Sequence, residues 1–218
     1  MSLSGLERLA PLTGVAFVVL VVVGGLVQGD SPDFLDDSET IASYYTDDSG
    51  QIMASSYLTM LAIPFLIWFV GTLRSRLRAV EVEGRLAGIA FAGGIAGATL
   101  LLASAITNAA AALRADEDAG IDPATATTLF DLSGALFGFS GLAFAALVGA
   151  SAVVALRFGG PLPRWLAWVS LALLIGLLTP YAWIFVLLTG IWILVVAVLL
   201  YTRPPSPAAG GPGIASPG

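Results

Sequence analysis

The sequence contains no cysteine, no histidine and no lysine, so all nine of its basic residues are arginine. Without cysteine no disulfide can form, and the redox state of the compartment cannot be inferred. Without thiolate and imidazole groups the usual ligands of zinc, copper and haem are missing, and we expect neither a metal nor another cofactor. The same absences exclude Ser-His, Cys-His and Ser-Lys nucleophile pairs. We therefore expect no catalytic residues and no enzyme.

Charge of either sign is also scarce. Charged residues make up 11% of the 218 residues, hydrophobic residues make up 57%, and the mean hydropathy is +0.92. Soluble domains carry about 25% charged residues, so this chain lacks the polar groups needed to cover a globular surface. The composition predicts an integral membrane protein whose main partner is the lipid bilayer. The few scattered arginines also exclude a nucleic-acid-binding surface.

Long apolar stretches alternate with short polar segments. Six stretches approach the roughly 20 residues that a membrane-spanning helix needs, namely 11–29, 52–73, 86–113, 123–156, 162–178 and 180–201. As one helix, residues 162–201 would be about 60 Å long, twice the hydrocarbon thickness of about 30 Å. The chain is therefore predicted to turn, with Thr179 capping the next helix and Pro180 as its first residue. Asp122 and Pro123 form a similar start signal for the fourth stretch.

These patterns predict an all-α fold, a polytopic membrane helix bundle with six transmembrane helices over residues 1–203. Residues 204–218 are rich in proline and glycine and are predicted to be a disordered tail. If the N-terminus is cytoplasmic, eight arginines fall in cytoplasmic segments, and only Arg114 falls outside. The positive-inside rule therefore predicts that both termini are cytoplasmic. Eleven of the fifteen acidic residues lie in the two outer loops that this orientation gives.

The first outer loop, residues 30–51, carries seven acidic residues and no basic one. Asp36 and Glu39 have the spacing of a capping box. Ile41, Tyr44 and Tyr45 then share one helical face. We expect a short helix on the outer membrane surface, with its tyrosines toward the lipid headgroups. The alternative is a plain solvated acidic loop.

Several segments resemble a family of small bacterial six-helix integral membrane proteins of unassigned function. They are RLAPLTGVAFVVLVVVGG, IASYYTDDSGQIMASSYL, FVGTLRSRLR and PLPRWLAWVSL, and the similarity covers about residues 5–203. The resemblance implies a multi-pass protein of the bacterial inner membrane. It supplies no active-site residues.

The candidate functional residues are polar groups in the outer parts of the predicted helices. Asp131 is the ionisable residue within a predicted span, Asn108 lies at a similar depth, and Arg114 follows Asn108 by less than two turns. We expect Asp131 to pair with Arg114 or Asn108, directly or through water. The pair would serve either as a tether between helices or as a ligand or proton site. Gln28 and Tyr57 belong to a wider set of outer polar residues that predicts a polar vestibule. Gly93-xxx-Gly97 and Gly134-xxx-Gly138 predict close packing of the third and fourth helices.

Two functions are compatible with this sequence. One is a membrane protein that binds or transports a small ligand through an outward-facing polar pocket. The other is a structural or accessory membrane subunit that packs against a partner protein. The apolar middle of the predicted helices argues against proton-coupled transport, because secondary transporters bind their substrates near the midplane.

Overall fold

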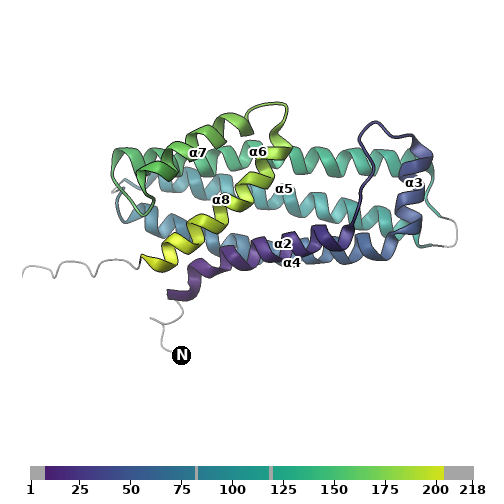
Figure 1. Ribbon diagram of the computed structural model, residues 1–218, viewed down its shortest axis with the longest axis horizontal. Coiled ribbons are helices and arrows are strands. Elements are labelled where there is room, and N and C mark those ends of the chain that lie inside the picture. The colour runs from purple at the N-terminus through teal and green to yellow at the C-terminus, as the bar shows by residue number, and fades with distance from the viewer. Residues whose placement is uncertain (1–7, 82, 118–119, 204–218) are drawn as a thin grey trace, which may run out of the picture.

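The computed structural model describes residues 8–81, 83–117 and 120–203, and these residues form helices and connecting segments without a strand (Figure 1). The predicted tail at 204–218 lies outside the described residues. In chain order the elements are η1 (Ala10–Leu12), α2 (Thr13–Gln28), α3 (Ser38–Asp47), α4 (Ser49–Arg78), α5 (Arg85–Ala115), α6 (Pro123–Arg157), α7 (Arg164–Leu177) and α8 (Ala182–Thr202).

Five segments are long and apolar enough to span a membrane: Ala10–Gln28, α4, α5, α6 and α8. This is the architecture of a multi-pass membrane protein. The remaining apolar helix, α7, has 14 residues, about 21 Å, which is shorter than the hydrocarbon core of about 30 Å. The bundle thus contains five helices of spanning length, and a sixth span stays a prediction.

The predicted turn between α7 and α8 is confirmed, but its residues act differently from the prediction. The helix α8 begins at Ala182, with no side-chain cap, so Pro180 is not its first residue. The Thr179 hydroxyl donates to the carbonyl of Gly176 at 2.7 Å and closes the end of α7. Thr179 therefore ends one helix instead of starting the next.

The third and fourth long helices, α5 and α6, pack closely where glycines meet the neighbouring backbone and rings. A Cβ added at Gly93 would lie 2.6 Å from the carbonyl oxygen of Ala143, and one added at Gly97 would lie 2.5 Å from the Phe144 ring. Real Cβ atoms essentially never make contacts this short, so a larger residue would require the Ala143 backbone or the Phe144 ring to move. The close packing predicted from the glycine spacing is confirmed for Gly93 and Gly97.

Helix starts are set by carboxylates. Asp122 caps α6 as predicted, since its carboxylate accepts from the backbone N–H of Thr125 at 3.1 Å. The start of α5 uses Glu81, which the sequence did not reveal. Its two carboxylate oxygens accept from the N–H groups of Leu86 at 2.7 Å and Ala87 at 2.8 Å, and its side chain is buried.

The short helix predicted in the acidic segment is present as α3, but its details differ. Its cap is Asp37, whose carboxylate accepts from the N–H of Thr40 at 2.8 Å. Asp36 instead accepts from the N–H of Asp33, so the predicted cap was wrong by one residue. The Thr40 backbone bond holds the pKa of Asp37 below its usual value.

The tyrosines of α3 do not point toward lipid headgroups. Tyr44 and Tyr45 are buried together with Ile41 in a small apolar core formed with the ends of α4, α5 and α6. Ile41, Tyr44 and Tyr45 do share one face of α3, as their spacing predicts, but this face is covered by other helices of the protein and not by the membrane surface. The reason is length, because α4, α5 and α6 have 30, 31 and 35 residues, or about 45 to 52 Å, and extend far enough to reach α3.

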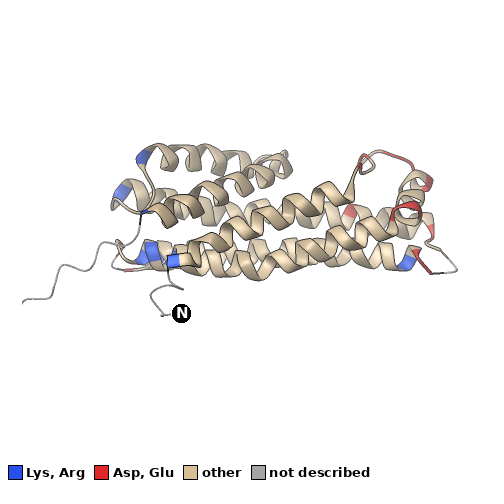
Figure 2. Cartoon of the chain, turned by 60° about the horizontal axis from the view of Figure 1, so that its bottom comes forward, with Lys and Arg blue, Asp and Glu red and all other residues tan. Residues whose placement is uncertain are grey.

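The two ends of the bundle differ in charge (Figure 2). Arginines gather at the end that holds both ends of the described chain, and acidic residues gather around α3 at the opposite end. The helices α4 to α6 are longer than a hydrocarbon core about 30 Å thick. The acidic end, with α3 across it, has the polar composition of a region outside that core.

Candidate functional site

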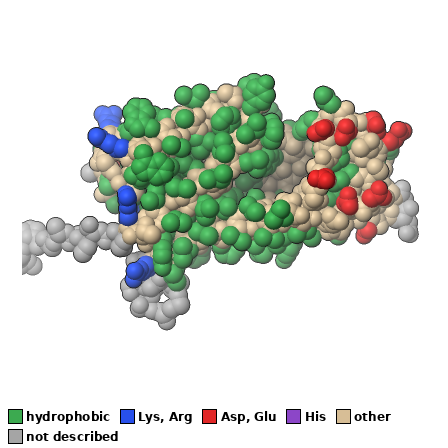
Figure 3. Space-filling view, viewed as in Figure 1, with side chains coloured by type: hydrophobic (Ala, Val, Ile, Leu, Met, Phe, Trp, Pro, Cys, Tyr) green, Lys and Arg blue, Asp and Glu red, His purple; other side chains and the backbone are tan. Residues whose placement is uncertain are grey.

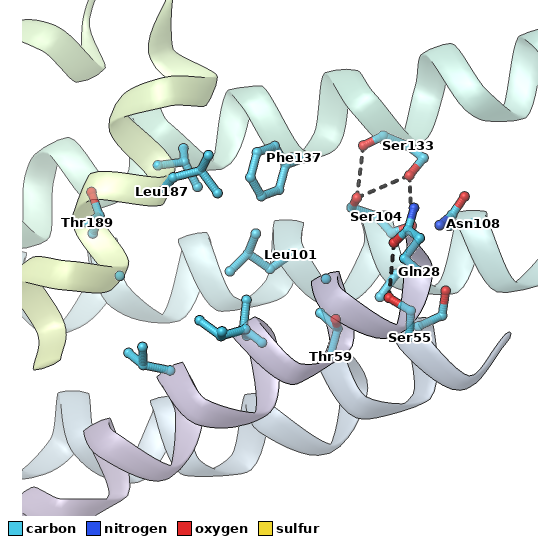
Figure 4. Close-up of a pocket in the computed structure, with 18 of the residues that line it drawn as sticks. Gln28, Ser55, Thr59, Leu101, Ser104, Asn108, Ser133, Phe137, Leu187 and Thr189 are labelled. Atoms are coloured by element: carbon cyan, nitrogen blue, oxygen red, sulfur yellow. Dashed lines mark hydrogen bonds between the residues drawn. The ribbon is translucent and has the colours of Figure 1, made fainter. Parts of the chain in front are cut away.

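A pocket of about 520 Å³ lies inside the bundle, walled by α2, α4, α5, α6 and α8 (Figure 4). One face of α2 contributes Val18, Val21, Gly25 and Gln28, which recur at three- or four-residue spacing. The other walls are lined by Ser31, Ser55, Ser56, Thr59, Leu101, Ser104, Asn108, Phe130, Ser133, Gly134, Phe137, Phe144, Val186, Leu187, Thr189, Gly190 and Ile193, among others.

The end of the pocket nearest α3 is polar, and a hydrogen-bond chain runs through Gln28. The Gln28 amide nitrogen donates to the Tyr44 hydroxyl at 2.9 Å, and its oxygen accepts from Ser55 Oγ at 3.0 Å. Ser31 Oγ also donates to Tyr44, at 3.2 Å. Gln28 is thus fixed between α3 and α4, because its amide nitrogen bonds to Tyr44 and its amide oxygen bonds to Ser55.

Asn108 is held in a similar way by the neighbouring tyrosine. The Tyr45 hydroxyl donates to Asn108 Oδ1 at 2.8 Å, and the Tyr45 side chain is completely buried. Burial in this apolar core raises the pKa of Tyr45, since the phenolate would be poorly solvated. The side-chain oxygen of Asn108 is therefore occupied, and its amide nitrogen has no acceptor among the described residues.

A reciprocal serine pair joins α5 to α6 beside Asn108. Ser104 Oγ donates to the carbonyl of Ser133 at 2.9 Å, and Ser133 Oγ donates to the carbonyl of Ser104 at 3.2 Å. These bonds, drawn in Figure 4, tie the two helices at the level where the pocket becomes polar. They satisfy both hydroxyl groups and stabilise the helix pair.

Ser56 differs from the other hydroxyl groups of the wall. It is 3% exposed, and its Oγ has no hydrogen-bond partner among the residues that the structure describes. A buried hydroxyl without a partner is costly, and native structures contain few of them.

Of the residues predicted to form the site, the structure brings Gln28 and Asn108 together on the pocket wall. Asp131, Arg114 and Tyr57 are not part of that wall. Tyr57 is 67% exposed on the outside of α4. Among the described residues no hydrogen bond or ion pair joins Asp131 to Arg114 or Asn108, and the Asn108 oxygen is bonded to Tyr45. The direct pairing predicted for Asp131 is therefore wrong, and pairing through water stays a prediction.

Sequence reasoning missed the contribution of α3. Tyr44 and Tyr45 orient the two amide side chains of the pocket, although both tyrosines precede Asn108 by more than 60 residues. Their shared face with Ile41 indicated burial, but not against which helices. Ser104 and Ser133 were also missed as a pair, because nothing in a single sequence indicates which hydroxyl groups face each other.

The wall supplies neutral hydrogen-bonding groups at one end and apolar surface at the other. Such a wall suits noncovalent binding, since the polar groups can orient a ligand while apolar area supplies affinity. Comparisons with protein-family models, with curated proteins and with solved structures give no match. The resemblance to small bacterial six-helix membrane proteins therefore stays a prediction.

Proposed function

We propose that this chain is a multi-pass protein of the bacterial inner membrane, with both termini in the cytoplasm, that binds a small ligand in the pocket between α2, α4, α5, α6 and α8. The observation that carries the proposal is the composition of the wall, in which neutral polar groups gather at one end and apolar side chains at the other. Asn108 belongs to that wall, and its amide nitrogen has no acceptor among the described residues. A ligand group that accepts from this nitrogen would add a hydrogen bond that the protein alone does not make.

The arrangement of charge supports the proposed orientation. The arginine-rich end would face the cytoplasm, in agreement with the positive-inside rule. The pocket's polar end would then lie toward the outer surface, beneath α3. A binding role fits this arrangement better than proton transport, since none of the residues on the wall is ionisable at neutral pH.

Two pocket glycines provide a direct test. Among the described residues, a Cβ added at Gly25 or at Gly190 meets no heavy atom within 4 Å, and both glycines line the pocket, so leucine at these positions has space to occupy it. Gly88 on α5 is equally open but lies away from the pocket, and Gly88→Leu is the matched control. Leucine is also the better helix former, so all three variants should fold.

The measurement is mass spectrometry of the small molecules that accompany the protein when it is extracted from its native membrane in copolymer discs. We expect a molecule present with the wild type and with Gly88→Leu, and absent from the Gly25→Leu/Gly190→Leu double variant. An identical set of molecules in all three preparations would contradict the binding function.

A second candidate function, an accessory subunit, is favoured by one surface feature. Leu35 is 98% exposed and Phe34 is 62% exposed in the acidic segment before α3. Apolar side chains in this position gain free energy when a partner protein covers them. If this is the function, Leu35→Glu should abolish the association with a membrane partner while the pocket still retains its ligand.

A further inference from the structure

The pocket is divided along its length into a polar and an apolar end, which Figure 4 shows side by side. Gln28, Ser55, Ser104, Asn108 and Ser133 gather at one end. Away from them the wall is made by Leu101, Phe137, Leu187 and further aliphatic and aromatic side chains, where the Thr189 hydroxyl is already bonded to the carbonyl of Phe185 at 2.8 Å. A ligand that matches this wall has a polar head and an apolar body.

The head must be uncharged. All the polar side chains of the wall are amides and hydroxyl groups, and none carries a formal charge. An ion moved into such a site would lose its hydration without gaining an opposite charge, which costs several kcal/mol even after relaxation. Hydroxyl, ester and amide groups avoid that cost and can accept from the amide nitrogen of Asn108.

The polar and apolar ends of the pocket lie at the depths that the head group and the chain of an outer-leaflet amphiphile occupy. Ser56 precedes Arg78 by 22 residues along α4, and Asn108 follows Arg85 by 23 residues along α5, or about 33 to 35 Å of helix. With the arginines at the inner boundary, the polar end lies close to the outer boundary of a core about 30 Å thick. The apolar end lies below it, at the depth of acyl chains.

One side of the pocket, between α2 and α6, is not closed by helix packing. The helix α2 packs against α4 and α8, and α6 packs against α5, α7 and α8, but α2 and α6 do not pack along each other. The helix α8 crosses from α6 to α2 over only one half of the bundle (Figure 1). The same face is hollowed between α8 and the acidic end in the space-filling view (Figure 3).

The upper edge of this opening is formed by the segment that joins α2 to α3. The Phe34 ring lies against Gly134 of α6, where an added Cβ would come within 2.6 Å of the ring, and it lies 5.8 Å from the Phe130 ring centroid. The segment thus bridges α2 and α6 above the opening. A molecule in the outer leaflet can reach the pocket sideways, below this bridge, without passing through water.

We propose that the pocket takes a neutral amphiphile with one hydrogen-bonding head group and a single apolar chain or ring system, received laterally from the outer leaflet between α2 and α6. The volume of about 520 Å³ is that of a small-molecule site. The proposal rests on the binding function proposed above and adds the chemical class of the ligand and its route.

The experiment uses the full chain reconstituted in phosphatidylcholine vesicles and a monoacylglycerol probe with a diazirine and an alkyne in its chain. After irradiation, labelled peptides are mapped by mass spectrometry. We expect labels on the apolar end of the pocket, around Phe137 and Leu187. Gly25→Leu/Gly190→Leu should reduce labelling there to background, and Gly88→Leu should leave it unchanged.

Two further comparisons test the head group. A fatty-acid probe with the same chain but a carboxylate head should label the pocket much less than the monoacylglycerol probe. Asn108→Asp keeps an oxygen that accepts from Tyr45 but removes the amide donor, so it should weaken pocket labelling about five- to tenfold, the loss of one hydrogen bond to the ligand.

Labelling spread evenly over the lipid-facing surface and insensitive to the glycine variants would overturn the proposal, as would equal labelling by the carboxylate probe. The binding function is tested separately. If a water-soluble molecule is lost from the Gly25→Leu/Gly190→Leu protein taken from native membrane while the probe never labels the pocket, the binding function stands and the amphiphile proposal fails. If neither the native molecule nor the probe responds to these substitutions, both fail.

Discussion

Tyr45 is the side chain on which the outer end of the protein most depends. It is fully buried, contacts Tyr44 and Phe130 through its ring, and donates its hydroxyl to Asn108. Tyr45→Phe keeps the ring and removes the bond, so we expect a loss of about 1 kcal/mol in the free energy of unfolding. Denaturant titration in detergent measures this loss. Tyr57→Phe, on the exposed outside of α4, is the control and should have no effect.

The raised pKa of Tyr45 also predicts a pH dependence. Its ordinary pKa is 10.0, and burial makes the neutral phenol the favoured form in the folded protein. The stability that comes from the neutral group is complete below pH 10 and decreases as the pH rises above that value, because the unfolded chain then releases the proton first. Melting temperatures between about pH 8 and pH 11 should fall more steeply for the wild type than for Tyr45→Phe. Parallel curves for the two proteins would contradict this assignment.

Among the elements, α5 has a start that depends on one buried carboxylate. Glu81 bonds to two backbone N–H groups of the first turn, where the helix dipole also favours negative charge. Glu81→Ala should cost about 1–2 kcal/mol in the free energy of unfolding, as other cap deletions do. Glu83→Ala, two residues along and exposed, should be neutral. Equal stabilities for the two variants would show that α5 starts without this cap.

The elements also show where sequence reasoning succeeds and where it fails. Apolar length predicted the long helices, and the Asp122-Pro123 pair predicted the start of α6, because both signals are local. The start of α5 was missed because Glu81 acts across a turn, five and six residues before the N–H groups it binds. The direct pairing of Asp131 was wrong because similar depth on adjacent helices does not determine which way a side chain points. The partners of Asn108 come from α3, and no local pattern reveals such a contact.

At the scale of the whole molecule, the charge difference between the two ends predicts orientation in the cell. Ser43 is exposed on α3 at the acidic end, and Ser75 is exposed near the arginine-rich end. Because the native chain has no cysteine, single cysteines at these positions can be labelled without background. On intact cells an impermeant thiol reagent should label Ser43→Cys and not Ser75→Cys. The reverse pattern would place the arginines outside and refute the proposed orientation.

Because α8 covers only one half of the bundle, the lipid or detergent around the protein forms part of the pocket wall. Where α2 and α6 do not pack together, the wall is completed by whatever surrounds the protein. In a bilayer that material is acyl chain, and after extraction it is detergent, which is itself an amphiphile. A detergent with a neutral sugar head and one alkyl chain would compete for the same groups as the proposed ligand. Apparent affinities should therefore change with the choice of detergent even when the fold does not, and a preparation without added ligand is not an empty one.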